Sequence, residues 1–203
     1  MIDNFNLING ILEYNGLNND TDAYYHLQII QRKKDISGLG CNNVLLKAII
    51  IDNEHSLSRF KEDIISLCEY YKARAYINVG PKSKKKTAIH MLRDLAECFE
   101  KGDFNYIKRL WNTAAGTVPA IQKRWIIDCD WSEEFTEKNV DEIICIVNDS
   151  MPEGTNVIAK VPTLNGIHLI TRSFDSRNLK EKYPDIDLHK NNPTVLYVPN
   201  SLM

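Results

Sequence analysis

The sequence lacks any long hydrophobic segment. None of its apolar runs reaches the length of about 18 residues that a membrane-spanning helix needs. Its first six residues contain no basic stretch followed by an apolar one, which is the pattern of a signal peptide. We therefore expect a cytoplasmic protein that does not contact a membrane.

Paired cysteines are also missing. The five cysteines lie far apart, and no two of them are separated by only two residues. An odd number of cysteines without paired spacing does not resemble a disulfide framework or a structural zinc site. We expect reduced thiols that behave mostly as small core residues.

The chain has no excess of basic charge, since its formal net charge is −2. Domains that bind nucleic acid mainly through charge are usually strongly basic. Lysine and arginine are nevertheless clustered, in residues 32–34, 82–86 and 123–124. A local basic track can coexist with an acidic metal site, so the charge balance neither identifies nor excludes a nucleic-acid enzyme.

With 203 residues and 43% hydrophobic content, the chain is long enough for one domain with its own core. We divide it into an N-terminal α/β module, residues 1–121, and a second unit, residues 122–203. Apolar periodicity in the first module predicts helices at 1–15, 56–71, 84–101 and 104–111, and strands at 26–31, 44–51 and 74–79. Gly116 and Pro119 indicate that residues 112–121 form a loop.

The second unit has a more regular pattern. It predicts strands at 123–130, 156–161, 166–172 and 193–198, and helices at 136–149 and 176–182. This β-α-β-β-α-β order is typical of the RRM-like or ferredoxin-like plan, in which an antiparallel sheet carries its helices on one face. We therefore expect an α+β fold whose open sheet face is free to carry a site.

Two carboxylates end the first strand of this unit. Asp128 and Asp130 are two residues apart, so on a strand their side chains point to the same side. Two like charges held close together need compensation, and Mg²⁺ is commonly held by one or two carboxylates together with substrate phosphates. The alternative is a strand end that merely turns into a loop.

His168 is the polar member of the apolar run at residues 167–170, two positions after Gly166. In the β-α-β-β-α-β plan the first and third strands are neighbours, so His168 is expected to lie near Asp128 and Asp130. Glycine would permit a close approach there. A half-buried histidine bonded to the backbone is the alternative interpretation.

A second acidic pair, Asp185 and Asp187, precedes the last predicted strand. A third carboxylate would complete a site for two metal ions, and either residue could supply it. The alternative is a surface turn.

These segments resemble the motifs of the archaeo-eukaryotic primase superfamily, which includes primase-polymerases and the polymerase domain of bacterial end-joining ligases. Residues 125–130 look like the first motif, 163–168 are similar to the second, and 186–188 with Asn191, Asn192 and Thr194 look like the third. The resemblance covers residues 74–199. It implies an RRM-like catalytic unit preceded by an α/β module.

The resemblance implies a nucleotidyltransferase in which Asp128, Asp130 and Asp187 bind Mg²⁺ or Mn²⁺. His168 would bind the incoming nucleoside triphosphate. Because of their charge or their place on a strand, Arg172 and Lys190 are further candidates for binding the nucleotide. Arg74, Lys82, Lys84 and Lys85 are candidates for contacting the template. The expected partners are a nucleic-acid template, nucleoside triphosphates, and a helicase or other replication proteins. Compact modules of this kind are frequent in phages, which would place the protein in the host cytoplasm.

Two other functions stay open. The same carboxylates could serve a metal-dependent phosphoesterase or nuclease with water as nucleophile. A non-catalytic RNA-binding module could share the β-α-β-β-α-β plan, but such a module presents aromatic side chains on its central strands. Residues 165–170 contain none. Trp131, beside the carboxylates, could stack on a base or pack at the rim of the core.

Overall fold

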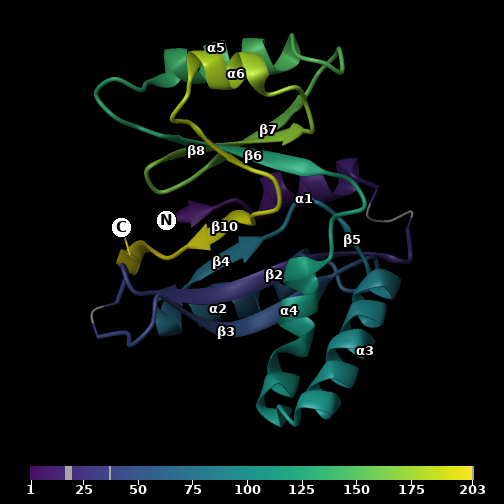
Figure 1. The fold of residues 1–203 in the computed structure, drawn as a ribbon. Helices are drawn as coiled ribbons and strands as arrows, with labels where there is room; N and C mark the ends of the chain where they lie inside the picture. The colour runs from purple at the N-terminus through teal and green to yellow at the C-terminus, as the bar shows by residue number, and fades with distance from the viewer. Residues whose placement is uncertain (17–19, 37, 203) are drawn as a thin grey trace.

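The computed structural model describes residues 1–16, 20–36 and 38–202, and shows an α+β fold with two antiparallel sheets (Figure 1). The first sheet contains, in spatial order, β1 (Ile2–Asp3), β10 (Thr194–Val198), β4 (Arg74–Ile77), β2 (Ala23–Arg32) and β3 (Asn43–Ile51). A short strand, β5 (Lys82–Ser83), pairs with the start of β2. The second sheet contains β7 (Val157–Pro162), β8 (Gly166–Arg172), β6 (Arg124–Asp130) and β9 (Asp187–His189).

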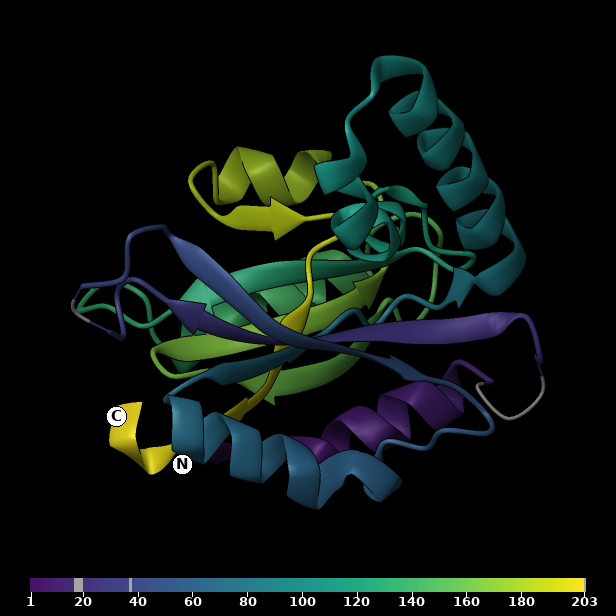
Figure 2. The same ribbon diagram turned by 90° about the horizontal axis from the view of Figure 1, so that it is seen from below.

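Helices flank this pair of sheets. The second sheet carries α5 (Glu137–Asn148) and α6 (Arg177–Lys182) on the side away from the first sheet (Figure 1). α1 (Phe5–Tyr14) contacts β10 and β7, and α2 (Lys61–Tyr71) packs on β2, β4 and β10 (Figure 2). The side chain of Asn4 joins the sheets directly, since its amide donates to the carbonyls of Pro162 at 2.9 Å and Val195 at 3.1 Å.

Successive side chains of β6 point to opposite faces of the second sheet, so the strand contributes to two different cores. Ile127 and Cys129 are buried in the core beneath α5 and α6, together with Val140 and Ile143 of α5. Ile126 points the opposite way and belongs to the core shared with the first sheet. Each fully buried side chain of this size contributes about 1.5–3 kcal/mol. Asp128 lies on the Ile126 face, so the strand is anchored on one side and presents its carboxylate between the sheets.

A helical arm, residues 84–117, projects from the end of the first sheet at which β5 lies (Figure 1). It consists of α3 (Lys84–Lys101), the 3₁₀ turn η3 (Phe104–Arg109) and α4 (Leu110–Thr117). The Ser83 hydroxyl accepts a hydrogen bond from the Lys86 amide and begins α3. Gly102, with φ of 69°, ends it in the left-handed conformation that glycine adopts without strain. The predicted helix at residues 84–101 is therefore confirmed.

Three predictions about the elements need correction. Residues 112–117 belong to α4 (Leu110–Thr117) and do not form the expected loop, because Leu110, Ala114 and Ala115 bury an apolar side before Pro119 stops the helix. The polar segment at residues 187–189 is a strand, β9, at the edge of the second sheet. The last predicted strand, 193–198, does not close the second sheet but lies in the first one as β10, between β1 and β4.

All five cysteines are free, and Cys68, Cys98 and Cys129 are buried as expected. Across the described residues, no helix combines the length and the hydrophobicity needed to cross a membrane.

Candidate functional site

Three polar side chains, two aspartates and a histidine, form a row across the second sheet, which we call the acidic row. Asp128 on β6 pairs with His168 on β8 at one side and with Asp187 on β9 at the other. Side chains directly opposite each other on antiparallel strands have Cβ atoms about 5 Å apart. The structure thus brings together three of the predicted residues, which are distant in the sequence.

His168 is held between the two sheets. Its Nε2 atom lies 3.3 Å from Oδ1 of Asp128, and its Nδ1 atom lies 2.8 Å from the hydroxyl of Thr194. Thr194 is fully buried and belongs to β10 of the first sheet. The imidazole therefore has a fixed orientation, set by a carboxylate from one sheet and a hydroxyl from the other.

The Asp128 carboxyl group is half-buried and charged at neutral pH. Its interaction with His168 lowers its pKa, while burial acts in the opposite direction and the charges of His168, His189 and Lys34 lower it further. The carboxylate is thus available as an oxygen ligand over the whole neutral range.

Gly166 is required by the approach of two strands rather than by a ligand. It pairs with Asp130 on β6, and a Cβ atom added to it would lie 2.0 Å from the carbonyl oxygen of Cys129. Only glycine fits there. The side chain of Asp130 is exposed at the end of β6, two residues beyond Asp128 and on the same face.

A basic wall faces the acidic row across the gap between the sheets. Arg32, Lys34 and Arg74 line a hollow of about 200 Å³ together with Asp128 and Asp130. Burial lowers the pKa of Lys34, and the nearby Arg32 and Arg74 lower it further. Cations of the first sheet and carboxylates of the second therefore share one cavity.

The cations of this wall differ in how free they are. Arg74 is buried and forms a two-pronged ion pair with Asp35, at 2.5 and 2.7 Å. Arg32 donates to the hydroxyl of Tyr76 at 3.2 Å. In the structure, Arg74 lines the hollow as a paired group and is not an exposed template contact.

Two larger hollows adjoin Asp128. One, of about 500 Å³, lies on the β9 side and is lined by Asp130, Asp185 and Asp187 with Lys182. The other, of about 400 Å³, lies between the sheets and is lined by Arg32, Tyr76, His168 and His189 among others. Asp128 lines all three hollows, which makes it the junction of the site.

Two of the predicted nucleotide ligands lie elsewhere. Arg172 is on the same face of β8 as His168 but four residues along, about 13 Å, and it donates to the hydroxyl of Tyr14. The ammonium group of Lys190 lies 4.8 Å from the ring of Trp125, which faces away from Asp128. The structure does not bring either cation to the acidic row.

The lysines predicted to contact a template lie at the opposite end of the first sheet. β5 pairs with Ala23 and Tyr24, about 25 Å along β2 from Arg32. Lys82 is buried and its ammonium donates to the carbonyls of Ala115 at 2.5 Å and Val118 at 2.8 Å. Lys82 is therefore a buried structural cation in this fold and is not exposed to a template.

The two neighbouring lysines have different surroundings. Lys84 is paired with Asp52 at 2.7 Å, whereas Lys85 is exposed. Both follow β5, at the end of the first sheet far from Arg32 and Asp128. Trp131 is partly exposed just beyond the end of β6, where its amide donates to the carbonyl of Asn165.

Residues of the site that were missed come mainly from the first sheet. The sequence gives no local signal that Arg32, Tyr76 and His189 belong to the site, and the motif that includes Thr194 does not reveal its contact with His168. The basic run at residues 32–34 was visible in the sequence, but nothing local distinguishes it from the run at 82–86. Only the packing of the sheets decides which run faces the carboxylates.

The donor set suits a hard divalent cation. Within residues 1–16, 20–36 and 38–202, no three His, Cys, Asp or Glu side chains are arranged as a ready-made metal site. Mg²⁺ and Mn²⁺ do not need one, because they are commonly held by one or two carboxylates plus substrate phosphates. Asp128, Asp130 and Asp187 are oxygen donors on neighbouring strand positions, and phosphate ligands could be held by the basic wall.

No protein-family model, curated protein or solved structure matches this chain.

Proposed function

We propose that this protein is a nucleotidyltransferase of the primase-polymerase type, which joins nucleotides on a nucleic-acid template. The observation that carries the proposal is one cavity in which Asp128, Asp130 and His168 face the cations Arg32 and Lys34. Asp187 pairs with Asp128 on the neighbouring strand and lines the adjoining hollow. Nucleotidyl transfer requires carboxylates for metal ions and cations for a triphosphate within reach of each other. This cavity offers both.

The arrangement of the second sheet supports the proposal. Its elements follow in the order β6-α5-β7-β8-α6-β9, and its strands lie in the order β7-β8-β6-β9. This order is compatible with the β-α-β-β-α-β plan, in which the first and third strands lie at the center. The short β9 takes the place that we had expected residues 193–198 to fill.

Asp128, Asp130 and Asp187 would hold the divalent ions, which polarise the α-phosphate and stabilise the leaving pyrophosphate when bound. Arg32 and Lys34 would bind the triphosphate as charge-assisted hydrogen-bond donors. His168, held by Asp128 and Thr194, would keep the carboxylate in place beside the nucleotide. The gap between the sheets would exclude bulk water from the phosphate chain.

The RNA-binding alternative receives less support from the same surface. The face of β6 and β8 between the sheets carries Ile126, Asp128, His168 and Ile170, without an aromatic side chain. A non-catalytic module of this plan stacks bases on aromatic residues at these positions.

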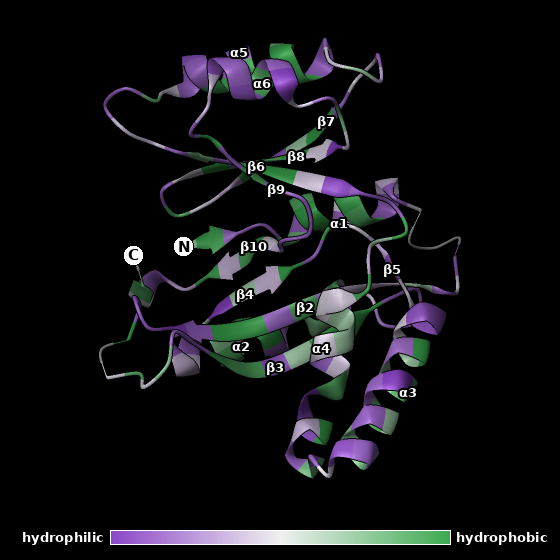
Figure 3. Ribbon diagram, viewed as in Figure 1, coloured by the Kyte–Doolittle hydropathy of each residue, from purple (hydrophilic) through white to green (hydrophobic). Residues whose placement is uncertain are grey.

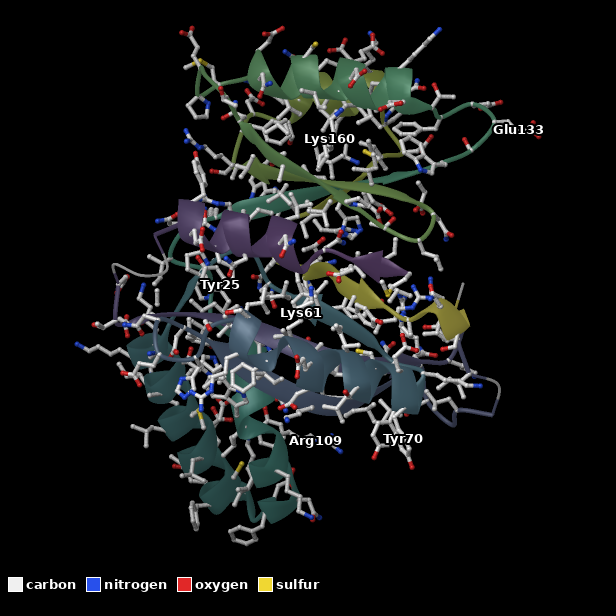
Figure 4. The ribbon with its side chains drawn as sticks, turned by 180° about the vertical axis from the view of Figure 1, so that it is seen from behind. Tyr25, Lys61, Tyr70, Arg109, Glu133 and Lys160 are labelled. Atoms are coloured by element: carbon white, nitrogen blue, oxygen red, sulfur yellow. The ribbon has the colours of Figure 1, made fainter. Side chains whose placement is uncertain are left out.

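The decisive experiment measures incorporation of a labelled nucleotide into a primed template, with Mg²⁺ or with Mn²⁺. Asp128→Ala with Asp130→Ala should lower the rate by at least about 1,000-fold, because the metal ligands are removed. The matched control is Glu133→Ala with Glu153→Ala, two exposed carboxylates outside the hollows; Glu133 lies on the projecting loop in Figure 4. The control should keep the wild-type rate within about twofold.

Equal incorporation by the wild type and the Asp128 and Asp130 variant would refute the proposed role of the acidic row. Release of mononucleotides without incorporation, lost in the same variant, would instead establish a phosphoesterase or nuclease.

A further inference from the structure

The helical arm carries an apolar stripe that faces away from the rest of the molecule. Ile89, Leu92, Ala96 and Phe99 are spaced by three, four and three residues, which places them on one side of α3. Ile89 is 42% exposed, Leu92 66% and Phe99 62%. The opposite side of α3 buries Thr87 and Cys98. The stripe is therefore not part of the core of the arm.

The tip of the arm continues this apolar surface. Phe104 is 56% exposed, and its ring lies 5.6 Å from that of Phe99. Ile107 is also exposed. α3 forms the outermost edge of the arm in two perpendicular views (Figures 1 and 2), and hydrophobic bands recur along it in Figure 3. Single exposed apolar residues are ordinary, but a contiguous surface of this kind marks an interaction site.

The charges along α3 are divided between its two ends. Lys85 and Lys86 begin the helix beside Lys84, which is paired with Asp52, whereas Glu100 lies in its last turn. Glu97, also near this end, is paired with Lys101 of the same helix. A helix with this distribution is complementary to a copy of itself that runs in the opposite direction, since each basic end meets an acidic end. A parallel copy would place like charges together.

We propose that α3 is the interface through which two copies of this chain associate, with their α3 helices antiparallel. Pairing centered near residue 94 places Ile89 opposite Phe99 of the second copy, and Leu92 opposite its Ala96. The apolar side chains of the two stripes therefore pack against each other. In the flanking positions Lys86 meets Glu100 of the second copy. Because the pairing is two-fold symmetric, every contact occurs twice.

Like charges also meet in this arrangement, at its center. Arg93 lies near the two-fold axis and faces Arg93 of the second copy. Glu97, four residues further along the same helix, offsets part of that repulsion, although it also pairs with Lys101. The association is weak for a second reason, since one helix and the tip of the arm bury an area at the lower end of specific interfaces, about 1,000 Å² in total. We therefore expect a dimer that forms in the micromolar range.

The dimer leaves the candidate site open. The arm begins beside β5, at the end of the first sheet opposite to Arg32 and the acidic row. The proposal consequently stands or falls independently of the proposed function.

The test is sedimentation analysis of the full chain from about 1 to about 200 μM, the range in which small interfaces associate. The wild type should form a dimer as its concentration rises. Leu92→Gln with Phe99→Gln should remain monomeric, with dimerisation at least about 30-fold weaker. As a control, Tyr70→Gln removes an aromatic side chain of α2 that is 80% exposed and should dimerise like the wild type (Figure 4).

Charge reversal tests the antiparallel direction. Lys86→Glu alone and Glu100→Lys alone should each weaken the dimer about tenfold, and the double reversal should restore it. Neither change harms α3 itself, because Lys86→Glu gives Ser83 a capping-box partner and Glu100→Lys adds a cation near the helix C-terminus.

Three results would overturn the proposal: a wild type that is monomeric at every concentration, a dimer unaffected by Leu92→Gln with Phe99→Gln, or a double reversal that stays as weak as the single ones. The first result would mean that the apolar stripe of α3 does not bind a second copy of this chain. The last would exclude the antiparallel arrangement described here.

Discussion

The two ends of β2 carry basic clusters that look alike in the sequence but have different surroundings. At the C-terminal end, Arg32 and Lys34 face Asp128 and Asp130 across a cavity. At the N-terminal end, the ammonium of Lys82 is enclosed by backbone carbonyls, and that of Lys84 is paired with Asp52. Charge in the sequence is therefore not the same as charge available to a ligand. What each cation contacts decides whether it stabilises the fold or recognises a phosphate.

The largest expected effect concerns Lys82, at the structural end. Lys82→Met should lower the free energy of unfolding by about 3 kcal/mol, because it leaves the carbonyls of Ala115 and Val118 without their donor. Lys85→Met, an exposed neighbour, should change it by less than about 0.5 kcal/mol. Urea unfolding followed by circular dichroism measures both. Equal stability of the two variants would show that Lys82 is not a structural cation.

A smaller effect at the same end depends on pH. His26 is buried on β2 beside Trp111, and burial lowers its pKa to about 4, from about 6.5 for an exposed histidine. The unfolded chain therefore takes up a proton that the folded chain does not, and stability falls as the pH drops from 6.5 towards 4. Between about pH 7.5 and pH 5 the loss should be about 2 kcal/mol.

His26→Phe should remove this contribution while keeping an aromatic ring against Trp111. Unfolding measured at both pH values in the wild type and the variant gives the comparison, since other groups titrate equally in both. The same pH dependence in the two proteins would mean that the pKa of His26 does not differ between the folded and the unfolded chain.

The smallest expected effect concerns nucleotide binding by Arg32 and Lys34, at the C-terminal end of β2, and it rests on the proposed function. Arg32→Met and Lys34→Met should each weaken binding of a nucleoside triphosphate about tenfold, the size expected for one charge-assisted contact. Lys84→Met and Lys85→Met, from the structural end, should leave it unchanged. Fluorescence anisotropy of a labelled nucleotide in the presence of Mg²⁺ would measure all four. An equal loss of nucleotide affinity in both pairs of variants would show that Arg32 and Lys34 bind the nucleotide no more specifically than Lys84 and Lys85.

Much of the second sheet could be predicted because its signals are local. The strand that ends in Asp128 and Asp130, and the strand that carries His168, alternate in hydrophobicity, and their order along the chain makes them neighbours. β9 was missed because three residues, Asp187 to His189, are too few and too polar to show a strand pattern. Its pairing with β6 is set by the sheet and not by its own composition.

The contribution of the first sheet to the site could not be predicted from local patterns. A strand signal at residues 193–198 says nothing about which sheet the strand will join, so the contact of Thr194 with His168 remained invisible. The same holds for Arg32 and Tyr76, whose positions depend on how two sheets pack. Likewise, the surroundings of Lys82 depend on α4, a helix of two turns. Gly116 and Pro119 led to the prediction of a loop in this segment.

The position of β10 has a consequence for how the molecule can be divided. This strand comes from the C-terminal part of the chain, yet it lies between β1 and β4, two strands from the N-terminal part. Separating the chain near residue 121 would leave β1 and β4 with unsatisfied backbone groups along a missing strand. It would also deprive β10, whose Thr194 contacts His168, of the two strands between which it lies. The acidic row and the basic wall are thus parts of one cooperative folding unit, in which neither half persists as an autonomous building block.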